Sequence, residues 1–424
     1  MKEVEFGYGR GKLVGKFKEE ELLGVLTSHI EEYEPELEGR ALVRKALDEP
    51  VGSKKLSELA KGRKKVVIIA SDHTRPVPSK VIMPEMLADI RKGNPDAEIT
   101  ILIATGCHRG TTKDELVDKF GEEIVQNENI YIHDCDDREM LVNIGTLPSG
   151  APCEINKIAF EADLLVAEGF IEPHLFAGFS GGRKSVLPGI ASRETVMGNH
   201  CSEFIANKNA RTGILDGNPV HEDMLWAAQN AKLCFIVNVV LNAEKKPIFA
   251  VSGDTVLAHK KGTDFLSKYC GVKALPADIA ITTNGGYPLD QNTYQAAKGM
   301  TAGEATVKEG GVVIMLSESE DGTGGDHFFR VLADSETVDE AMDKVLARGR
   351  NQTVPDQWQA QIILRVLQKA RVVYVSKIDD ETVEKMHMIP AHSLDEAIQK
   401  AKALVGRDDA TITAIPDGIA VMVR

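Results

Sequence analysis

Runs of apolar residues that alternate with helical segments constrain the fold of this chain more than any other feature of its sequence. Four such runs are predicted to be strands: Val66–Ala70, Glu98–Ala104, Asp163–Phe170 and Cys234–Leu241. Because both faces of these strands are apolar, each face needs a covering layer, which helices from the intervening segments supply. The pattern is typical of an α/β protein with a parallel sheet.

The same alternation resumes after Gly271, where Asp278–Thr283 and Gly311–Ser317 are predicted strands that flank a helix over Asn292–Val307. We therefore predict an α/β fold of two domains, with mainly parallel sheets and an active-site cleft between the domains. The first domain is expected to span residues 1–270, completed by residues 395–424. The second is expected to span residues 275–392.

The N-terminal residues precede this alternation and carry a different pattern. Residues 3–18 alternate around Gly9, Arg10 and Gly11, which predicts a β-hairpin. The polar residues 19–32 that follow are predicted to be helical.

Net charge and cysteine usage limit the possible partners and the compartment. The formal charge of −14 argues against nucleic acid and anionic membrane as partners, because both require a cationic surface. The chain has no apolar run of the length that a signal peptide or membrane span needs, and its six cysteines form no Cys-x-x-Cys pair. We expect a cytoplasmic protein with free thiols and a small-molecule substrate; the sequence does not specify an oligomeric state.

Charged residues concentrate in the loops that directly follow four of the apolar strands. Ligands bind outside the carboxyl ends of strands in open parallel sheets, so these loops are expected to share one site, although any loop after a strand tends to be polar. The candidate side chains in the four loops are Asp72, His73 and Arg75; His108 and Arg109; His174, Arg183 and Lys184; and Asp290, Gln295 and Lys298.

The residue types suggest roles. His108 and His174 are candidates for acid–base work because imidazole titrates near neutrality, although a lone loop histidine is more often a capping residue. Arg75 and Lys298 can hold a carboxylate, although each can also form a surface ion pair. Lys184 follows Arg183 directly, and a neighbouring cation disfavours the ammonium form, so Lys184 is a candidate nucleophilic amine and covalent attachment point.

Three common motifs nearly match and fail. The stretch GFSGGRKS (residues 178–185) departs from the phosphate-binding loop at Arg183, and Pro188 would break the helix which that loop must open. Leu225 occupies the position of the second histidine of a zinc protease motif that would begin at His221. No Gly-x-Gly-x-x-Gly opens a helix after a strand. The motifs therefore disfavour an ordinary ATPase, a zinc protease and a standard dinucleotide fold.

Taken together, the strings SDHTRPVPS, TGCHRG, EGFIEPHLFAGFSGGRKSVLPGIA, NGGYPLDQNTYQAAKGMTA and PDQW resemble the nickel-dependent lactate racemase family. The strings lie between residues 71 and 358, and their order agrees with that of the family along the whole chain. Two positions differ from the pattern associated with lactate racemases: Cys107 and Gly110 flank the His-Arg pair where that pattern has an apolar residue and a proline.

The resemblance implies a nickel-pincer nucleotide, pyridinium-3-thioamide-5-thiocarboxylic acid mononucleotide, bound covalently to Lys184. It implies His200 as the nickel ligand and His108 and His174 as the paired acid–base residues. Further contacts with the cofactor or substrate carry over to Asp72, Arg75, Gly181, Gly182, Tyr294, Gln295, Lys298 and Trp358.

The implied reaction interconverts D- and L-lactate by hydride transfer through transient pyruvate, and it implies transient contact with cofactor-synthesis proteins. The alternatives are a racemase or epimerase of another 2-hydroxy acid with the same cofactor, and a carrier that holds the nucleotide without turnover. Paired histidines argue against a carrier, because a carrier needs no bases beside a substrate.

Overall fold

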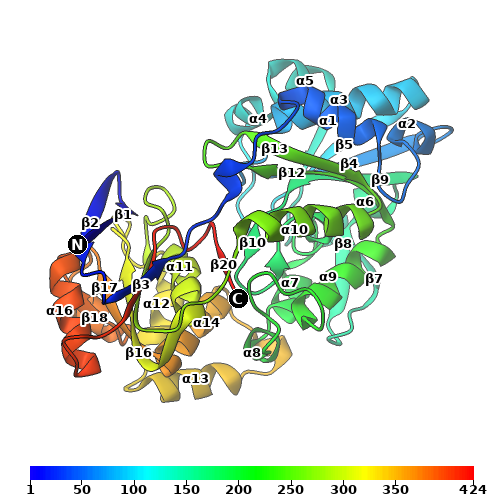
Figure 1. Cartoon of the computed structure of the whole chain (residues 1–424). Helices are drawn as coiled ribbons and strands as arrows, with labels where there is room; N and C mark the ends of the chain where they lie inside the picture. Colours follow the sequence, from blue (N-terminus) through cyan, green and yellow to red (C-terminus); the bar gives the residue numbers. More distant parts are fainter. The chain divides into compact units, whose positions relative to one another are not determined.

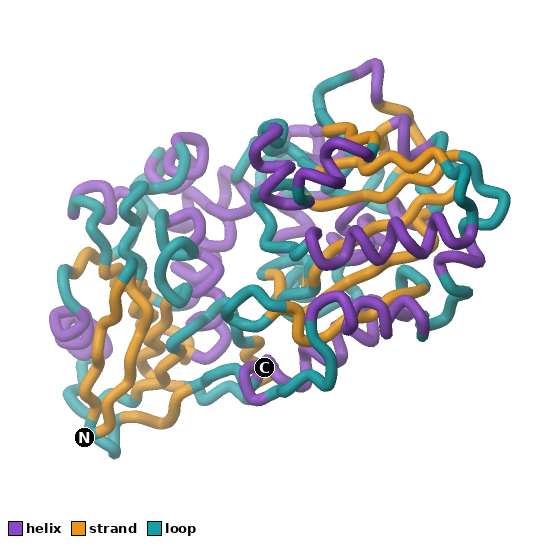
Figure 2. Tube along the Cα trace, turned by 90° about the horizontal axis from the view of Figure 1, so that it is seen from above, coloured by secondary structure: helices purple, strands orange, loops and turns teal.

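The computed structural model describes residues 1–424, which divide into two compact units (Figure 1). Unit 1 consists of Met1–His29, Cys201–Ala206 and Tyr269–Arg424. Unit 2 consists of Ile30–His200 and Asn207–Lys268. Each unit contains one six-stranded, mainly parallel sheet, and Figure 2 shows these strands with helices beside them. The predicted α/β fold with mainly parallel sheets is therefore confirmed.

The sheet of unit 2 has the strand order β13-β12-β9-β4-β5-β6. All neighbours are parallel except β12 and β13. Counted along the chain, this is the order 6-5-4-1-2-3 of doubly wound nucleotide-binding folds, here without their glycine motif. The strands are β4 (Lys65–Ser71), β5 (Glu98–Ala104), β6 (Asn129–Ile132), β9 (Leu164–Phe170), β12 (Leu233–Leu241) and β13 (Pro247–Gly253).

Helices cover both faces of this sheet, as its apolar strands require. Side chains of α1 and α3 form one buried cluster with alternate residues of the strands, such as Val66, Ile68 and Ala70 of β4. Figure 1 shows α10 on the opposite side. The larger helices of the unit are α1 (Gly39–Asp48), α3 (Ser79–Gly93), α4 (Lys113–Phe120), α7 (Arg193–Asn199), α9 (Pro219–Asn230) and α10 (Leu257–Cys270).

Smaller elements complete unit 2. A hairpin of β7 (Leu141–Thr146) and β8 (Pro152–Asn156) lies between β6 and β9 along the chain. The remaining elements are α2 (Leu56–Leu59), α5 (Glu122–Asn127), α6 (Lys157–Phe160), β10 (Pro173–His174), β11 (Gly178–Phe179) and the 3-10 turn η3 (Gly182–Ser185).

The sheet of unit 1 has the order β18-β17-β16-β15-β19-β3, and all of its strands are parallel. One face packs on α11 to α14 and the other on α16 and the N-terminal hairpin. The strands are β3 (Leu22–Val25), β15 (Ala277–Thr283), β16 (Val307–Leu316), β17 (Arg371–Val375), β18 (Ile389–Ala391) and β19 (Ile412–Ile415). The packed elements are β1 (Lys2–Tyr8), β2 (Gly11–Phe17), α11 (Thr293–Thr306), α12 (Asp326–Ala333), α13 (Val338–Leu346), α14 (Gln357–Lys369) and α16 (Leu394–Val405).

Both ends of the chain lie in unit 1, which differs from the predicted domain boundaries. Residues 1–29 were assigned to the first domain and residues 395–424 were expected to complete it. Instead β3 pairs with β19 in the second sheet, and β20 (Met422–Val423) pairs with β14 (Gly271–Val272). The predicted N-terminal hairpin is confirmed as β1 and β2, whereas the predicted helix over residues 19–32 is wrong. Pairing with β19, almost 400 residues away, outweighs the local helical preference of this polar segment.

None of the helices combines the length and the apolar character that crossing a bilayer would require.

Candidate active site

Four of the predicted site residues follow the two strands at which the sheet of unit 2 changes direction. From β4 the chain continues to β5 on one side, and from β9 it continues to β12 on the other side. Loops diverge at such a switch point, which leaves room for a ligand beyond the strand ends. Asp72 and Arg75 follow β4, while His174 and Lys184 follow β9.

A hydrogen bond fixes the orientation of His108. Its Nδ1 lies 2.7 Å from Oδ2 of Asp72, a carboxylate that is 1% exposed. The Thr74 hydroxyl donates to the other carboxylate oxygen at 2.7 Å. Burial by itself raises the pKa of Asp72, but the hydrogen bonds from His108 and Thr74 outweigh it and lower that pKa below its usual value. The ionised carboxylate therefore accepts a hydrogen bond from the Nδ1–H group, which leaves the lone pair of the neutral ring on Nε2.

Arg183 organises the glycine-rich loop after β9 from within. Its guanidinium is buried and donates to the carbonyl oxygens of Ala177, Ser180 and Gly181, and its Nε donates to Nδ1 of His221 at 2.9 Å. No carboxylate contacts it, and burial lowers the pKa of Arg183 to about 9. Arg183, the residue at which the sequence departs from the phosphate-binding loop motif, therefore stabilises this loop through buried hydrogen bonds.

Two further residues hold the same loop in place. The Gly182 N–H donates to Oδ1 of buried Asn238 on β12 at 2.9 Å. His259 on α10 donates from Nε2 to the Ser180 carbonyl at 2.8 Å. Gly181 and Gly182 have φ of +78° and +53°, a region that side chains with a Cβ rarely adopt, so glycine is required at both. The chain at this point forms η3, a single tight turn, in place of the helix of a phosphate-binding loop.

Lys184 follows Arg183 in η3, and its half-buried side chain makes no side-chain hydrogen bond. Burial lowers the pKa of Lys184 well below its ordinary value, and the charges of Arg183 and Arg75 lower it further, whereas Glu172 acts in the opposite direction. A neutral lysine amine is a nucleophile, as the sequence suggested from the Arg183–Lys184 pair alone.

Three aromatic rings connect the other candidates on this side of the sheet. The Phe176 ring lies edge-on to His174, with centroids 4.6 Å apart, and to His200, with centroids 5.2 Å apart. The Ala177 N–H donates to Nδ1 of His174 at 3.3 Å. His200 ends α7, and its Nδ1 donates to the Val196 carbonyl at 3.0 Å, which puts the lone pair of the neutral ring on Nε2. Burial, helped by the charge of Lys184, lowers the pKa of His200 to about 3.

Unit 2 therefore holds the predicted residues Asp72, Arg75, His108, His174, Gly181, Gly182, Lys184 and His200, at the carboxyl end of its sheet. Electrostatic contacts relate Asp72 to Arg75, Arg75 to Lys184, and Lys184 to His200.

The other four predicted residues belong to unit 1. Tyr294, Gln295 and Lys298 lie in the first turns of α11, directly after the loop that follows β15. Trp358 lies on α14, which is joined to α11 by a hydrogen bond of 2.7 Å from Gln359 to the Tyr294 carbonyl. Asn284 donates to the carbonyls of Leu289 and Gln295 and so fixes the loop that leads into α11. Asp290 is buried and holds the Gly9 and Glu318 N–H groups, so it has a structural role.

Sequence reasoning missed the partners of Arg183. His221 and His259 were not connected with the glycine-rich loop, since they lie 38 and 76 residues further along the chain. Glu168 on β9 was also missed: it is buried, and one of its carboxylate oxygens accepts from the Ser79 hydroxyl at 2.5 Å. A glutamate inside an otherwise apolar strand was the one available signal for it.

Comparisons with known proteins agree along the whole chain. The family profile of the lactate racemase N-terminal domain matches residues 8–213, and that of the lactate racemase C-terminal domain matches residues 272–423. The chain is 52% identical to lactate racemase of Thermoanaerobacterium thermosaccharolyticum and 51% identical to lactate racemase of Lactiplantibacillus plantarum, in both cases over the full length of both chains.

Solved structures show the same relationship. The lactate racemase apoprotein of T. thermosaccharolyticum superposes with a TM-score of 0.96 at 51% identity, and the match covers all of both chains. A Thermotoga maritima protein matches with a TM-score of 0.63 at 21% identity, over 92% of this chain and all of that one. This second match concerns the fold alone.

Proposed function

Since this chain belongs to the lactate racemase family, we propose that it is an isomerase that interconverts D- and L-lactate in the cytoplasm. The observation that carries the proposal is the group of His108, His174, Lys184 and His200 in the loops at the carboxyl end of the unit 2 sheet. It offers two histidines, a neutral amine and a neutral imidazole in one compact unit. Full-length identity to lactate racemases supports lactate as the substrate.

The donor set of unit 2 fits the nickel-pincer nucleotide that the family implies. A lysine must be neutral to form an amide-type bond, and Lys184 has both a strongly lowered pKa and a side chain without a hydrogen bond. A histidine must be neutral to bind a metal, and burial keeps His200 neutral with its lone pair on Nε2. We propose Lys184 as the covalent anchor and His200 as the nickel ligand, with Asp72, Gly181 and Gly182 beside the nucleotide.

When bound, this cofactor supplies an acceptor for the hydride that leaves C2 of lactate. His108 is oriented as a base, because Asp72 holds its Nδ1–H and the Nε2 lone pair can take the proton of the lactate hydroxyl. Loss of a hydride and a proton leaves pyruvate, whose planar carbonyl can be reduced from either face. His174 serves as the second acid–base group, so each enantiomer has its own histidine.

The substrate carboxylate needs cationic partners. We propose Arg75 and Lys298 for this role, because a guanidinium offers two parallel donors and an ammonium offers a compact charge. Tyr294, Gln295 and Trp358 are proposed as further substrate contacts. They lie with Lys298 on the neighbouring helices α11 and α14 of unit 1.

Intact mass and nickel content test the cofactor assignment. Protein from a host that makes the cofactor is expected to carry an adduct on Lys184 and about one nickel ion per chain, since His200 is the one protein ligand proposed. Lys184→Ala should lose the adduct and the activity. Lys119→Arg is a matched control, because burial also lowers the pKa of Lys119. An unmodified mass in fully active wild-type protein would contradict the assignment.

A screen of 2-hydroxy acids by polarimetry tests the substrate. We expect the largest kcat/KM with lactate, because the relatives of known activity at this identity are lactate racemases. Turnover of a different 2-hydroxy acid, without turnover of lactate by nickel-loaded protein, would identify the alternative racemase. If no 2-hydroxy acid were turned over, and His108→Ala and His174→Ala bound the cofactor as wild type does, the carrier hypothesis would replace racemisation.

A further inference from the structure

Two cysteines lie side by side at the ends of neighbouring strands β5 and β6. The strands pair in register from Thr100 to Ile103, and the pairing continues where the His133 N–H donates to the Ile103 carbonyl. Beyond this, the Thr105 hydroxyl donates to the His133 carbonyl at 2.6 Å. Cys107 and Cys135 each follow two residues later, which brings their side chains next to each other, near enough for the two thiols to interact.

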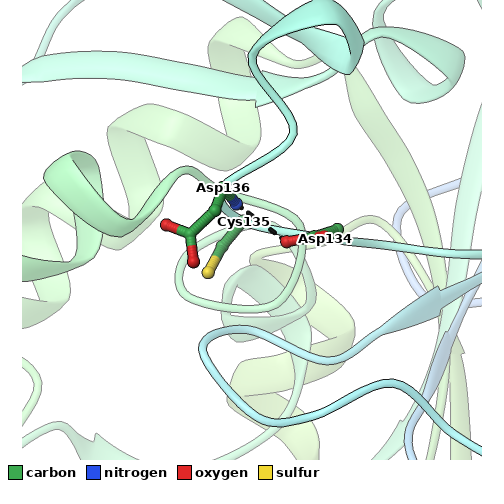
Figure 3. A group of neighbouring side chains, drawn as sticks. All are labelled: Asp134, Cys135 and Asp136. Carbon is green, nitrogen blue, oxygen red and sulfur yellow. Dashed lines mark hydrogen bonds between the residues drawn. The ribbon is translucent and has the colours of Figure 1, made fainter.

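The surroundings of Cys135 argue against a metal site. Figure 3 shows its thiol beside the Asp134 and Asp136 side chains, and one ligand atom of each residue lies within 4.8 Å of the others. Both carboxylates are already engaged, however. Asp134 accepts from the Asp136 N–H at 2.9 Å, and Asp136 accepts two hydrogen bonds from Arg193, at 2.9 and 2.6 Å. Asp134 therefore stabilises a turn, and Asp136 forms an ion pair with Arg193. Neither interaction accounts for the proximity of the two thiols.

We propose that Cys107 and Cys135 form a reversible disulfide that switches off the adjacent acid–base residue His108. All six cysteines are thiols in this structure, and these two are the pair in mutual contact. Cys107 is partly exposed, whereas Cys135 is buried, so one thiol is open to reagents and the other is held behind it. Arg193 is close enough to interact with both sulfur atoms. The contact with Cys107 and burial raise the pKa of Cys135, and the charge of Arg193 acts in the opposite direction.

The oxidant that we name is a low-molecular-weight disulfide such as oxidised glutathione. The Cys107 thiolate attacks one sulfur of that disulfide, its S–S bond breaks, and one glutathione thiol leaves with the proton that Cys107 gave up. Cys135 then gives up its proton and its sulfur attacks the Cys107 sulfur; the bond between Cys107 and glutathione breaks, and the second glutathione thiol leaves with that proton. Two protein thiols are oxidised to one disulfide, and one glutathione disulfide is reduced to two thiols.

The coupling to His108 follows from the chain itself. Cys107 directly precedes His108, whose orientation depends on one hydrogen bond of 2.7 Å to Asp72. A disulfide requires a sulfur–sulfur distance of about 2.05 Å, shorter than any contact between two separate thiols, so bond formation draws the loop at Cys107 and the end of β6 together. This movement takes His108 away from Asp72. The effect on activity rests on the proposed function, whereas formation of the bond does not.

The test is a glutathione redox titration of the holoenzyme, with alkylation of remaining thiols and peptide mapping. We expect wild-type protein to give a peptide linked between Cys107 and Cys135, with the loss of two hydrogen atoms, and dithiothreitol to reverse it. Cys135→Ser and Cys107→Ser should not form the link, whereas Cys234→Ser, at an exposed thiol outside the pair, should form it as wild type does. A map with no 107–135 link, or with links that involve Cys234, would overturn the disulfide.

Activity of the same samples tests the coupling separately. Oxidised wild-type protein should lose at least about tenfold in kcat and regain it with dithiothreitol, because the base is displaced. Cys107→Ser should keep its kcat throughout the titration, because it can form neither the mixed disulfide with glutathione nor the link to Cys135. A linked peptide with unchanged kcat would retain the disulfide and overturn the switch. If neither lactate nor another 2-hydroxy acid is turned over, the peptide map still decides whether the bond forms.

Discussion

At the scale of single residues, hydrogen bonds decide which nitrogen of each site histidine carries the proton. Asp72 fixes the tautomer of His108, and the Val196 carbonyl fixes that of His200. A histidine can act as a base or a metal ligand only through an unprotonated nitrogen. The chemistry proposed for both rings therefore depends on partners that take no part in the reaction itself.

Asp72→Asn is expected to lower kcat by roughly tenfold or more, because an amide can donate to Nδ1 and thereby favour the wrong tautomer of His108. Kinetics on nickel-loaded protein measure the effect, with the melting temperature as a check on folding. Thr74→Ser keeps the hydroxyl that supports Asp72 and serves as the control. Equal kcat values for Asp72→Asn and wild type would contradict the role of this carboxylate.

Arg183→Lys is expected to destabilise the protein by about 3 kcal/mol or more, because an ammonium lacks the planar fork and leaves buried loop carbonyls unsatisfied. Urea unfolding gives the free energy. The matched control is Arg109→Lys, an exposed arginine paired with Glu115, for which a change within about 0.5 kcal/mol is expected. Similar losses in the free energy of unfolding for the two substitutions would show that buried Arg183 has no special role in stability.

At the scale of elements, α4 begins just after the loop that carries His108. The Thr112 hydroxyl accepts from the Glu115 N–H, and the Glu115 side chain accepts from the Thr112 N–H, which together form a capping box. Glu115 also pairs with Arg109, whose hydrogen bond to the carboxylate contributes most to lowering the pKa of Glu115 to about 2. The first turn of α4 therefore restrains the loop that contains His108 at its C-terminal end.

Thr112→Ala is expected to cost about 1 kcal/mol of stability, since it removes the hydroxyl of the cap. Thr112→Ser should retain most of that stability because it keeps the oxygen. Urea unfolding of the two variants measures the difference. A loss of the same size in both would assign the effect to the methyl group instead of the cap.

At the scale of the whole molecule, unit 2 keeps several histidines neutral in its interior. Burial lowers the pKa of His200, His221 and His259 to about 3, and the charges of Lys184 or Arg183 add to the effect. An unfolded chain binds protons at these positions near pH 6.5. Because the folded pKa values lie lower, the stability that these groups provide is complete above pH 6.5 and is lost as the pH falls toward 3.

We therefore expect the free energy of unfolding to decrease between pH 7 and pH 5, with a contribution of about 2 kcal/mol from a fully buried histidine such as His259. His259→Gln can keep the donor to the Ser180 carbonyl but does not titrate, so it should flatten the slope by about that amount. Urea unfolding at the two pH values provides the measurement. An unchanged slope would mean that His259 does not contribute to the acid sensitivity.

Residues that are close together along the chain carry the information about the type of sheet and the position of the site. Apolar strands and the polar loops after them sufficed to predict a parallel α/β fold and a site at the strand ends, because buried parallel strands need apolar residues on both faces and their carboxyl ends meet at one edge. The motif strings predicted the family because each string is a short, local match, and the sequence comparisons confirmed the family. The expected cleft between the domains stays a prediction.

Local sequence patterns were thus sufficient to predict the kind of sheet and the family, and they indicated the loops that we propose for the chemistry. Tertiary structure decided that β3 joins the sheet beside β19, that Arg183 meets His221 and His259, and that Cys107 lies against Cys135. Each of these contacts joins residues 28 to about 390 positions apart. Periodicity and spacing describe how a residue relates to its near neighbours along the chain. A contact with a residue that is distant in sequence does not change that local pattern, so the pattern cannot predict it.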